Sequence, residues 1–308
     1  MPHIIVTGAA GFIGSHTVDC LLNSGHTVTG LDNFRTGQRA NLAAALTRPD
    51  FTFHECDVAR PGVLAALAAA RPVDAIIHLA ALVSVPESIA QPALNHSLNI
   101  EATFHVAEAA RLHRVPRVVF ASSAAVYGEP VRLPVSESDE KNPISPYGAA
   151  KLASEAILLG HAAAYGFVVR CHRYFNVFGP RQDPASPYSG VISIFQRQYR
   201  ESRPVTVYGD GCQTRDFISV HDVARANALA TTASHSGIAN ICTGQGTSLL
   251  ELASHFARRH PAAGSPIHAP ARAGDILHSI GNPSEAQRTL GFRATVTVES
   301  GLAELGAE

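Results

Sequence analysis

Residues 3–32 read HIIVTGAAGFIGSHTVDCLLNSGHTVTGLD, and this stretch decides the fold. It begins with a continuous apolar run that is typical of a buried strand, and apolar side chains at helical spacing follow as far as Leu22. A second apolar run, residues 26–31, ends at Asp32. Strand, helix and strand in this order predict a βαβ unit with a glycine-rich first turn.

The glycine-rich turn carries Gly8, Gly11 and Gly14 in a GxxGxxG spacing. Such glycines can serve only tight packing of a helix on a strand, but the flanking strand, helix and acid favour a nucleotide site. Glycines let the backbone approach a pyrophosphate, and the start of the next helix offers free N–H groups. Asp32 is placed to accept hydrogen bonds from an adenosine ribose and to repel a 2′-phosphate, so we expect NAD and not NADP.

Strand-like and helix-like segments go on alternating beyond Asp32. We expect strands at residues 51–56, 75–79, 117–121 and 168–173, and helices at residues 63–70 and 92–113. This rhythm predicts the α/β class with a doubly wound parallel sheet.

Past Asn176 the alternation breaks down and turn-forming residues become frequent. A helix is expected at residues 191–200, and a short strand with a glycine turn within residues 204–215. We therefore expect a second, smaller mixed α/β lobe that binds the substrate. The NAD-binding domain should comprise residues 1–173 and about 217–245, and the substrate lobe residues 174–216 and about 246–308.

The composition excludes several classes of partner. With 24 basic and 25 acidic residues among 308, no charge excess points to nucleic acid or to an anionic membrane surface. The five cysteines are odd in number, widely spaced and mostly set in apolar runs, which is typical of reduced thiols in a cytoplasmic protein. We expect no metal, no leader, no membrane-spanning segment and a cytoplasmic location.

The stretch SPYGAAKLASE, residues 145–155, is where we expect the chemistry. Tyr147 and Lys151 stand four apart in a helical pattern, so they share one face of the helix. A positive charge beside a phenol stabilises the phenolate and makes it a usable base near neutrality. Tyr and Lys are also common on helix surfaces, so this pair alone does not establish a site. The chain has only two lysines, Lys141 and Lys151, and otherwise uses arginine.

Polar or small residues come directly after the expected strands, at the edge where a doubly wound sheet binds ligands. Each alone is typical of a helix cap or a turn, and their common placement is what favours a site. They are Asp57, Ala80, Ala81, Ser122, Ser123, Tyr174 and Asn176.

Four motifs occur in order: GxxGxxG at residues 8–14, SSAAVYG at 122–128, YxxxK at 147–151 and RYFNVFG at 173–179. Together they resemble the extended short-chain dehydrogenase/reductase superfamily, and the chain is most similar to the UDP-hexose 4-epimerases within it. The resemblance covers essentially the whole chain. It implies a Rossmann fold with a UDP-sugar-binding lobe, NAD as cofactor, a UDP-sugar as substrate, and a homodimer formed through the long helices that begin at Pro92 and Pro146.

The resemblance implies catalytic roles for Ser123, Tyr147 and Lys151. Tyr147, as phenolate, would take the proton of the sugar 4-hydroxyl while hydride passes from carbon 4 to NAD. Ser123 would hydrogen-bond the same hydroxyl, and Lys151 would hold the nicotinamide ribose and lower the pKa of Tyr147. The 4-keto sugar would then turn over and take the hydride back on its other face.

Further positions carry over from the family motifs. Cofactor contacts are implied for Gly8, Gly11, Phe12, Ile13, Gly14, Asp32, Asn33, Arg35, Thr36, Gly37, Asp57, Val58, Leu79, Ala80, Ala81, Asn99, Tyr147, Lys151 and Tyr174. Substrate contacts are implied for Ser84, Ser122, Ser123, Tyr147, Asn176, Tyr208, Arg215, Arg272, Asp275 and Ser279. Within the second set, Tyr208 would lie against the uracil, and Arg215 with Arg272 would clamp the diphosphate.

Three small residues narrow the expected reaction. Relatives that dehydrate the sugar carry an Asp–Glu pair where this chain has Ala124 and Ala125, and methyl groups do no acid–base work. Ser279 falls where a bulky Tyr closes the pocket of epimerases restricted to non-acetylated sugars, although it can also be an uninformative surface serine. We expect 4-epimerisation of UDP-N-acetylglucosamine and UDP-N-acetylgalactosamine, with UDP-glucose and UDP-galactose as a further pair. A nucleotide-sugar dehydratase or reductase, and a non-catalytic NAD-binding protein, are the alternatives.

Overall fold

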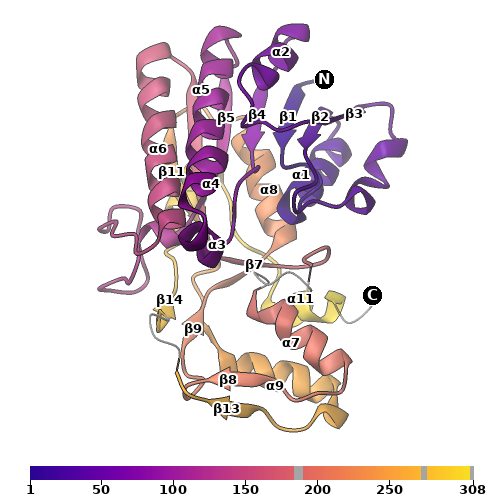
Figure 1. The fold of residues 1–308 in the computed structure, drawn as a ribbon, viewed down its shortest axis with the longest axis vertical. Coiled ribbons are helices and arrows are strands. Elements are labelled where there is room, and N and C mark those ends of the chain that lie inside the picture. Colours follow the sequence, from indigo (N-terminus) through magenta and orange to yellow (C-terminus); the bar gives the residue numbers. More distant parts are fainter. Residues whose placement is uncertain (184–189, 272–275, 306–308) are drawn as a thin grey trace.

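The computed structural model describes residues 1–183, 190–271 and 276–305 of the chain. Its central sheet contains the parallel strands β1 (His3–Thr7), β2 (Thr27–Asp32), β3 (Phe51–Glu55), β4 (Ala75–His78), β5 (Arg117–Ser123), β6 (Val168–Tyr174) and β11 (Gly237–Ile241). Their order is β11–β6–β5–β4–β1–β2–β3 (Figure 1). The chain winds outward from β1 in both directions, so the predicted doubly wound parallel sheet is confirmed.

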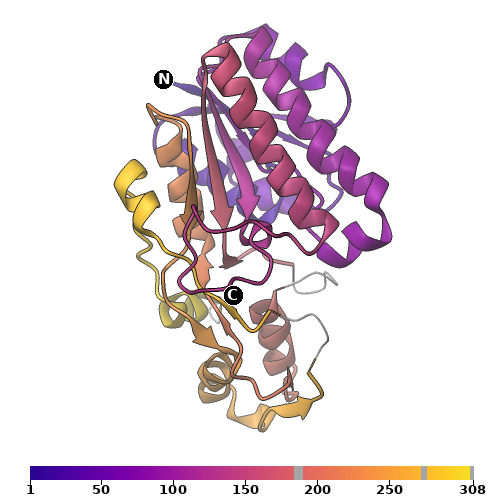
Figure 2. The ribbon, with the colours of Figure 1, turned by 90° about the vertical axis from the view of Figure 1, so that its left-hand side faces the viewer.

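Helices cover both faces of the sheet, and Figure 2 shows the pink and purple ones packed side by side along one face. The alternation of side chains along β1 explains both layers: Ile5 packs with the helices of that face, and Ile4 and Val6 pack with those of the other. The first face carries α2 (Val63–Ala70), α5 (Ala102–Leu112) and α6 (Pro146–Tyr165), and the second carries α1 (Phe12–Asn23) and α8 (Val220–Ala230).

The single helix predicted at residues 92–113 is interrupted. The structure has α4 (Pro92–Asn95), a π-helical segment (His96–Glu101) and then α5. Within the π-helical segment, buried Asn99 accepts a hydrogen bond from the amide of Leu82 and donates one to its carbonyl, both of 3.0 Å. Such segments are rare insertions in α-helices, and hydrophobic periodicity averaged over a helix does not reveal them.

The second lobe is the mixed α/β unit that the sequence predicts, below the sheet in Figure 1. Phe195, Tyr199 and Phe256 form part of its core, and the rings of Tyr199 and Phe256 stack with centroids 5.5 Å apart. Its elements include α7 (Val191–Arg200), β8 (Thr206–Tyr208), β9 (Thr214–Arg215), β12 (Thr247–Ser248), α9 (Leu249–Arg259), β13 (Ile267–Ala269), β14 (His278–Ser279) and α11 (Val298–Leu305). β8 pairs with β13, and β9 lies between β12 and β14.

Two short strands connect the sheet to this lobe. β7 (Asn176–Phe178) and β10 (Phe217–Ser219) form a parallel pair that stands apart from the seven-stranded sheet. The chain then returns to the sheet through α8 and β11, and α10 (Ser284–Leu290) packs near both. The chain thus crosses between the two units more than once, so residues from both meet at the carboxyl edge of the sheet.

None of the helices in the described ranges combines the length and apolar character that a membrane span requires. All five cysteines are free thiols. Among the described residues, no group of three or more His, Cys, Asp or Glu side chains is arranged to hold a metal ion.

Candidate active site

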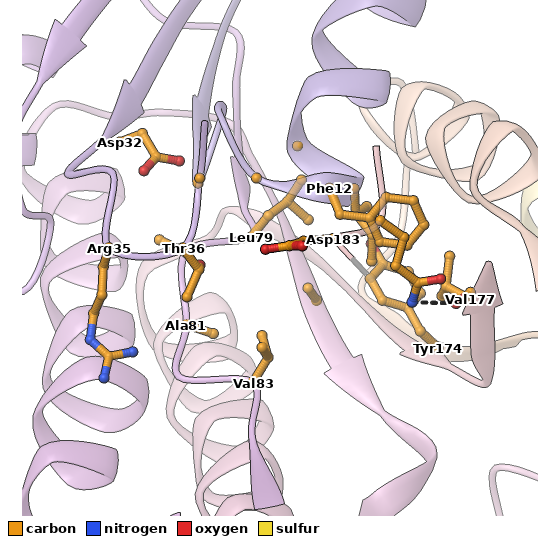
Figure 3. A pocket seen from close by; sticks show the side chains of 18 of the residues that line it. Phe12, Asp32, Arg35, Thr36, Leu79, Ala81, Val83, Tyr174, Val177 and Asp183 are labelled. Atoms are coloured by element: carbon orange, nitrogen blue, oxygen red, sulfur yellow. Dashed lines mark hydrogen bonds between the residues drawn. The ribbon is translucent and has the colours of Figure 1, made fainter. Parts of the chain in front are cut away.

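A cavity of about 840 Å³ opens at the carboxyl edge of the sheet, a volume within the range of small-molecule sites. Figure 3 shows Asp32, Arg35 and Val83 at one side of the cavity, with Phe12, Tyr174 and Val177 at the other. Residues of both lobes therefore face one space. The predicted site residues on its wall are Gly8, Gly11, Phe12, Ile13, Gly14, Asp32, Asn33, Arg35, Thr36, Gly37, Asp57, Val58, Leu79, Ala80, Ala81, Ser122, Ser123, Tyr147, Lys151, Tyr174 and Asn176.

The glycine turn after β1 is packed too closely for side chains. Gly8 has φ of +70°, and a Cβ there would lie 2.7 Å from the amide nitrogen of Ala80. A Cβ on Gly14 would lie 1.9 Å from the carbonyl oxygen of Gly8. Gly11 begins α1 without a side-chain cap, so the amides of the first helical turn are left for an anion at the cavity wall.

Asp32, the last residue of β2, lies on the cavity wall near this glycine turn. Its side chain is buried, and its two carboxylate oxygens accept hydrogen bonds from the amides of Ala10 (2.9 Å) and Phe34 (2.8 Å). Burial raises the pKa of Asp32, and the backbone hydrogen bonds oppose that rise. The carboxylate is thereby fixed at the cavity wall, where a hydroxyl donor suits it and a phosphate does not. Nearby, Arg35 Nη2 pairs with Glu87 Oε1 of α3 (Val85–Ala90) at 2.5 Å.

The start of α6 places Tyr147 and Lys151 on the cavity wall. Ser145 caps the helix by accepting a 3.1 Å hydrogen bond from the amide of Gly148, and Pro146 suits the first helical position. Lys151 Nζ lies 5.9 Å from the ring centre of Tyr147 and donates a 2.7 Å hydrogen bond to the carbonyl of Ala121. The cap therefore sets where the helix begins, and with it the place of both side chains.

Ser123 reaches the same point from the end of β5. Its hydroxyl accepts a 3.2 Å hydrogen bond from the amide of Ala125, within the short turn Ala124–Val126. Burial raises the pKa of Tyr147, and a hydrogen bond with Ser123 lowers it. Burial lowers the pKa of Lys151 to about 7, and the charge of Glu155 acts in the opposite direction. The arrangement joins a phenol, a hydroxyl and an amine, which is a proton-transfer group.

Four of the predicted site residues use their polar side-chain atoms in hydrogen bonds within the protein, and two of these four are not on the cavity wall. Tyr174 donates from its hydroxyl to Asn227 at 2.7 Å, so its ring alone faces the cavity. Asn176 Nδ2 donates to the carbonyl of Asp216 at 3.4 Å. Asn99 and Ser84 are absent from the described wall: Asn99 holds the backbone of Leu82, and Ser84 caps α3.

The second-lobe residues that the sequence predicts as substrate contacts lie apart from this cavity wall. Tyr208, Arg215 and Ser279 lie on β8, β9 and β14, and none of them is on the described cavity wall. The structure does bring Arg215 and Ser279 together, because they are partners in the parallel register of β9 and β14. Arg272 and Asp275 lie outside the described residues.

The cavity also has walls that the motifs did not predict. Arg181 has φ of +64°, and its guanidinium pairs with Asp19 of α1 at 2.8 Å. The turn-rich composition after Phe178 was the available signal, but it does not reveal which residues fold back over the sheet. The additional wall residues include Phe34, Gln38, Asn41, Val83, Leu98, Phe175, Val177, Phe178, Arg181, Gln182, Asp183, Val191 and Ile192.

Comparison with known proteins agrees with this geometry. A model of the NAD dependent epimerase/dehydratase family matches residues 4–242. The chain is 38% identical over 302 residues to a UDP-glucose 4-epimerase of Mycolicibacterium smegmatis, which covers 97% of this chain and 96% of the relative.

Two solved structures are similar over nearly their whole length. UDP-glucose 4-epimerase from Thermotoga maritima, crystallised with UDP-glucose, has a TM-score of 0.92 at 35% identity and covers 98% of this chain and 96% of its own. UDP-N-acetylglucosamine 4-epimerase from Methanobrevibacter ruminantium, in complex with UDP-N-acetylmuramic acid, has a TM-score of 0.93 at 33% identity and covers 99% and 98%.

Proposed function

The chain belongs to the NAD-dependent epimerase/dehydratase family, and from this premise we propose that it interconverts UDP-hexoses that differ in configuration at carbon 4. The observation that carries the proposal is the meeting of Ser123, Tyr147 and Lys151, hereafter the catalytic group, on one wall of a cavity that both lobes enclose. The enzyme is an NAD-dependent isomerase of the extended short-chain dehydrogenase/reductase superfamily.

The residues around the cavity fit NAD. The glycine turn admits no Cβ at Gly8 or Gly14, and the uncapped start of α1 offers amides to a pyrophosphate. Asp32 is held for a ribose hydroxyl, and a Cβ on Gly37 would lie 2.9 Å from its Oδ1, so this corner is equally tight. When bound, NAD supplies the acceptor and later the donor of the hydrogen at carbon 4.

The catalytic group moves the proton. Tyr147 takes the proton from the sugar 4-hydroxyl, and Ser123, which hydrogen-bonds Tyr147, orients that hydroxyl. Lys151, when protonated, favours the Tyr147 phenolate through its charge. After the 4-keto sugar has turned in the cavity, Tyr147 returns the proton to the oxygen at carbon 4.

The residues next to Ser123 disfavour elimination. The turn Ala124–Val126 begins with two alanines, so the positions beside the catalytic serine offer methyl groups and no acid or base. A 4,6-dehydratase or a decarboxylase needs a further acid–base group there. This observation supports epimerisation over the enzymatic alternative on the same fold.

For the sugar, we propose the N-acetylated pair, with the non-acetylated pair as additional substrates. Ser279 lies directly opposite Arg215 in the register of β14 and β9, and we place both residues on the substrate side of the second lobe. A small side chain here leaves room for an acetamido group during rotation. The likeness to the Methanobrevibacter ruminantium UDP-N-acetylglucosamine 4-epimerase supports this choice, and the likeness to UDP-glucose 4-epimerases supports the second pair.

We also propose that two copies associate through the outer faces of α5 and α6. Phe104 and Tyr165 are 44% and 56% exposed there, which is unusual for large apolar side chains. Ala156 and Gly160 are exposed on α6 beside them, and a Cβ on Gly160 would meet nothing within 4 Å. Exposed aromatic rings beside small side chains suit the close packing of these helices against a second copy.

Incubation with each UDP-hexose, and then separation of the epimers, tests the proposed function. Formation of UDP-N-acetylgalactosamine from UDP-N-acetylglucosamine, with no net NADH, is expected. A stable keto product would indicate a dehydratase, and NADH accumulating with substrate would indicate a dehydrogenase. Absence of any conversion of either sugar would contradict the proposal.

A further inference from the structure

A buried ion pair lies directly behind the catalytic group. Glu155 on α6 and Arg173 on β6 have side chains that are only 3% and 1% exposed, with Arg173 Nη2 at 2.7 Å from Glu155 Oε2. Arg173 Nε donates a second hydrogen bond, of 2.9 Å, to Glu155 Oε1. The pair is therefore bidentate, the strong geometry for a guanidinium and a carboxylate.

The same carboxylate holds the strand that carries Ser123. The hydroxyl of Ser122 donates to Glu155 Oε1 at 2.5 Å, and Ser122 faces Arg173 in the register of β5 on β6. Glu155 thus joins the end of β5 to α6. These are the two elements that supply the catalytic group.

Glu155 is also the neighbour of Lys151. The two residues are four apart on α6, so they lie one turn from each other on one face. Lys151 Nζ is directed between the carbonyl of Ala121, at 2.7 Å, and the ring of Phe120, whose centre is 4.9 Å away. Ala121 immediately precedes Ser122, so Lys151 and Glu155 hydrogen-bond adjacent residues of β5.

Within the described ranges, the other titratable groups around Lys151 carry no negative charge. His78 on β4 faces it, and burial lowers the pKa of His78 to about 3, which leaves the ring neutral. Tyr147 is a phenol whose pKa burial raises. Arg173 stands behind Glu155 and donates to the Tyr127 hydroxyl at 2.9 Å, and burial raises the pKa of Tyr127 to about 12. Among the described residues, Glu155 is the charge that raises the pKa of Lys151.

We propose that Glu155 is a positioning residue for the reaction: held by Arg173, its carboxylate fixes the Lys151 ammonium and the end of β5 in the arrangement that Tyr147 and Ser123 require. The inference rests on the proposed function of the catalytic group. A buried ion pair is weak evidence for stability by itself, since apolar replacements often serve as well. The Glu155–Arg173 pair adjoins both Lys151 and the strand that carries Ser123, so a role in catalysis accounts for it better than stability does.

The two lysines of the chain make a direct test practicable. The NAD-loaded protein is prepared with ¹³C-labelled lysine, and the Lys151 signal is identified by its loss in Lys151→Met and its retention in Lys141→Arg. In Glu155→Gln, we expect the pKa of Lys151 to fall by roughly one pH unit or more, because a full charge one helical turn away is lost. We also expect kcat to fall by on the order of tenfold or more, with KM little changed, since the ionised Tyr147 becomes scarcer.

Two comparisons separate positioning from mere structural support. Glu155→Asp keeps the charge and should recover the Lys151 pKa and part of kcat. Glu137→Gln is the matched control, because Glu137 is a half-buried carboxylate that binds the amide of Asn240 at 2.6 Å and does not adjoin Lys151. It should leave the Lys151 pKa where it is in the unmodified protein.

An unchanged Lys151 pKa in Glu155→Gln, whatever happens to kcat, would overturn the proposal. If Glu155→Gln does not fold, the double variant Glu155→Gln/Arg173→Met removes both charges without leaving a buried guanidinium unpaired. A fall in the Lys151 pKa is again expected, smaller than in Glu155→Gln because a positive charge is lost as well. Because the Lys151 titration does not depend on turnover, it remains informative if the protein proves not to epimerise UDP-hexoses. Failure of the proposed function and failure of this inference are therefore distinguishable.

Discussion

The ammonium of Lys151 lies 5.9 Å from the ring centre of Tyr147, one turn along the same helix. Both side chains face a cavity whose opposite walls come from the second lobe. The helix begins where it does because Ser145 caps it, so a local sequence signal fixes the separation of the base and its charged neighbour. We propose that across this separation a protonated Lys151 favours the Tyr147 phenolate, against the burial that raises the pKa of Tyr147.

Replacing Tyr147 by Phe should remove the base and leave the fold intact. We expect kcat to fall by about 10³-fold, within the range for loss of a general base, while the melting temperature changes little. The measurement is the initial rate of epimer formation. Tyr165→Phe removes the same hydroxyl from the exposed end of the same helix and should keep the full rate. Equal rates for both variants would show that Tyr147 is not the base.

The pH dependence of stability should reveal the buried Lys151. Its pKa is lowered to about 7 in the folded protein without NAD, from 10.5 when unfolded, so the unfolded chain binds more protons between these values. Burying Lys151 therefore weakens the fold fully below pH 7, and the penalty disappears as the pH rises to 10.5. Lys151→Met should raise the melting temperature of NAD-free protein by several degrees at about pH 6 and by little at about pH 10.

Lys141→Met is the matched control for that experiment. Lys141 is the other lysine of the chain and is only partly buried. Burial and the charge of Arg173 lower its pKa. Its replacement should have a much smaller effect at about pH 6. A Lys151→Met protein that is less stable than the unmodified one at that pH would contradict the assignment of a strained, buried ammonium.

Ser279→Tyr should close the space proposed for the acetamido group. Turnover of UDP-N-acetylglucosamine should fall by on the order of tenfold or more relative to UDP-glucose, because the added ring clashes with the larger sugar alone. The measurement is the ratio of kcat/KM for the two substrates. Ser234→Tyr, in an exposed bend before β11, should keep the ratio of the unmodified enzyme. An unchanged ratio in Ser279→Tyr would exclude Ser279 as a gate.

Phe104→Glu should break the proposed association of two copies. A carboxylate in place of an aromatic ring that the second copy covers is costly to bury, so the protein should sediment as a single chain. Val131→Glu introduces the same charge at a side chain that is 98% exposed and should leave the sedimentation unchanged. Sedimentation of the unmodified protein as a single chain at micromolar concentration would refute the dimer.

The sheet and the cofactor edge of the site could be predicted from the sequence because their signals are local. The apolar runs of β1 and β2, Gly8 and Asp32 each mark one point in a regular unit. The spacing of Tyr147 and Lys151 likewise predicts that they share one face of α6.

The remainder depends on contacts between distant segments. Asn99 is predicted as a cofactor contact, and the sequence does not reveal that a π-helical segment directs its amide to the backbone of Leu82. Arg181 lies on the cavity wall and pairs with Asp19, which is far away in the chain. The Glu155–Arg173 pair joins α6 to β6, and no spacing in the sequence predicts that contact.

Proton NMR of a UDP-hexose incubated with the enzyme in D₂O tests the central claim most directly. If the hydrogen at carbon 4 is held by bound NAD while Tyr147 moves only the hydroxyl proton, both 4-epimers should appear with ordinary hydrogen retained at carbon 4. UDP-N-acetylglucosamine and UDP-glucose are to be tested separately. Deuterium incorporated at a carbon of the sugar, or a single unchanged epimer with both substrates, would contradict 4-epimerisation by this catalytic group.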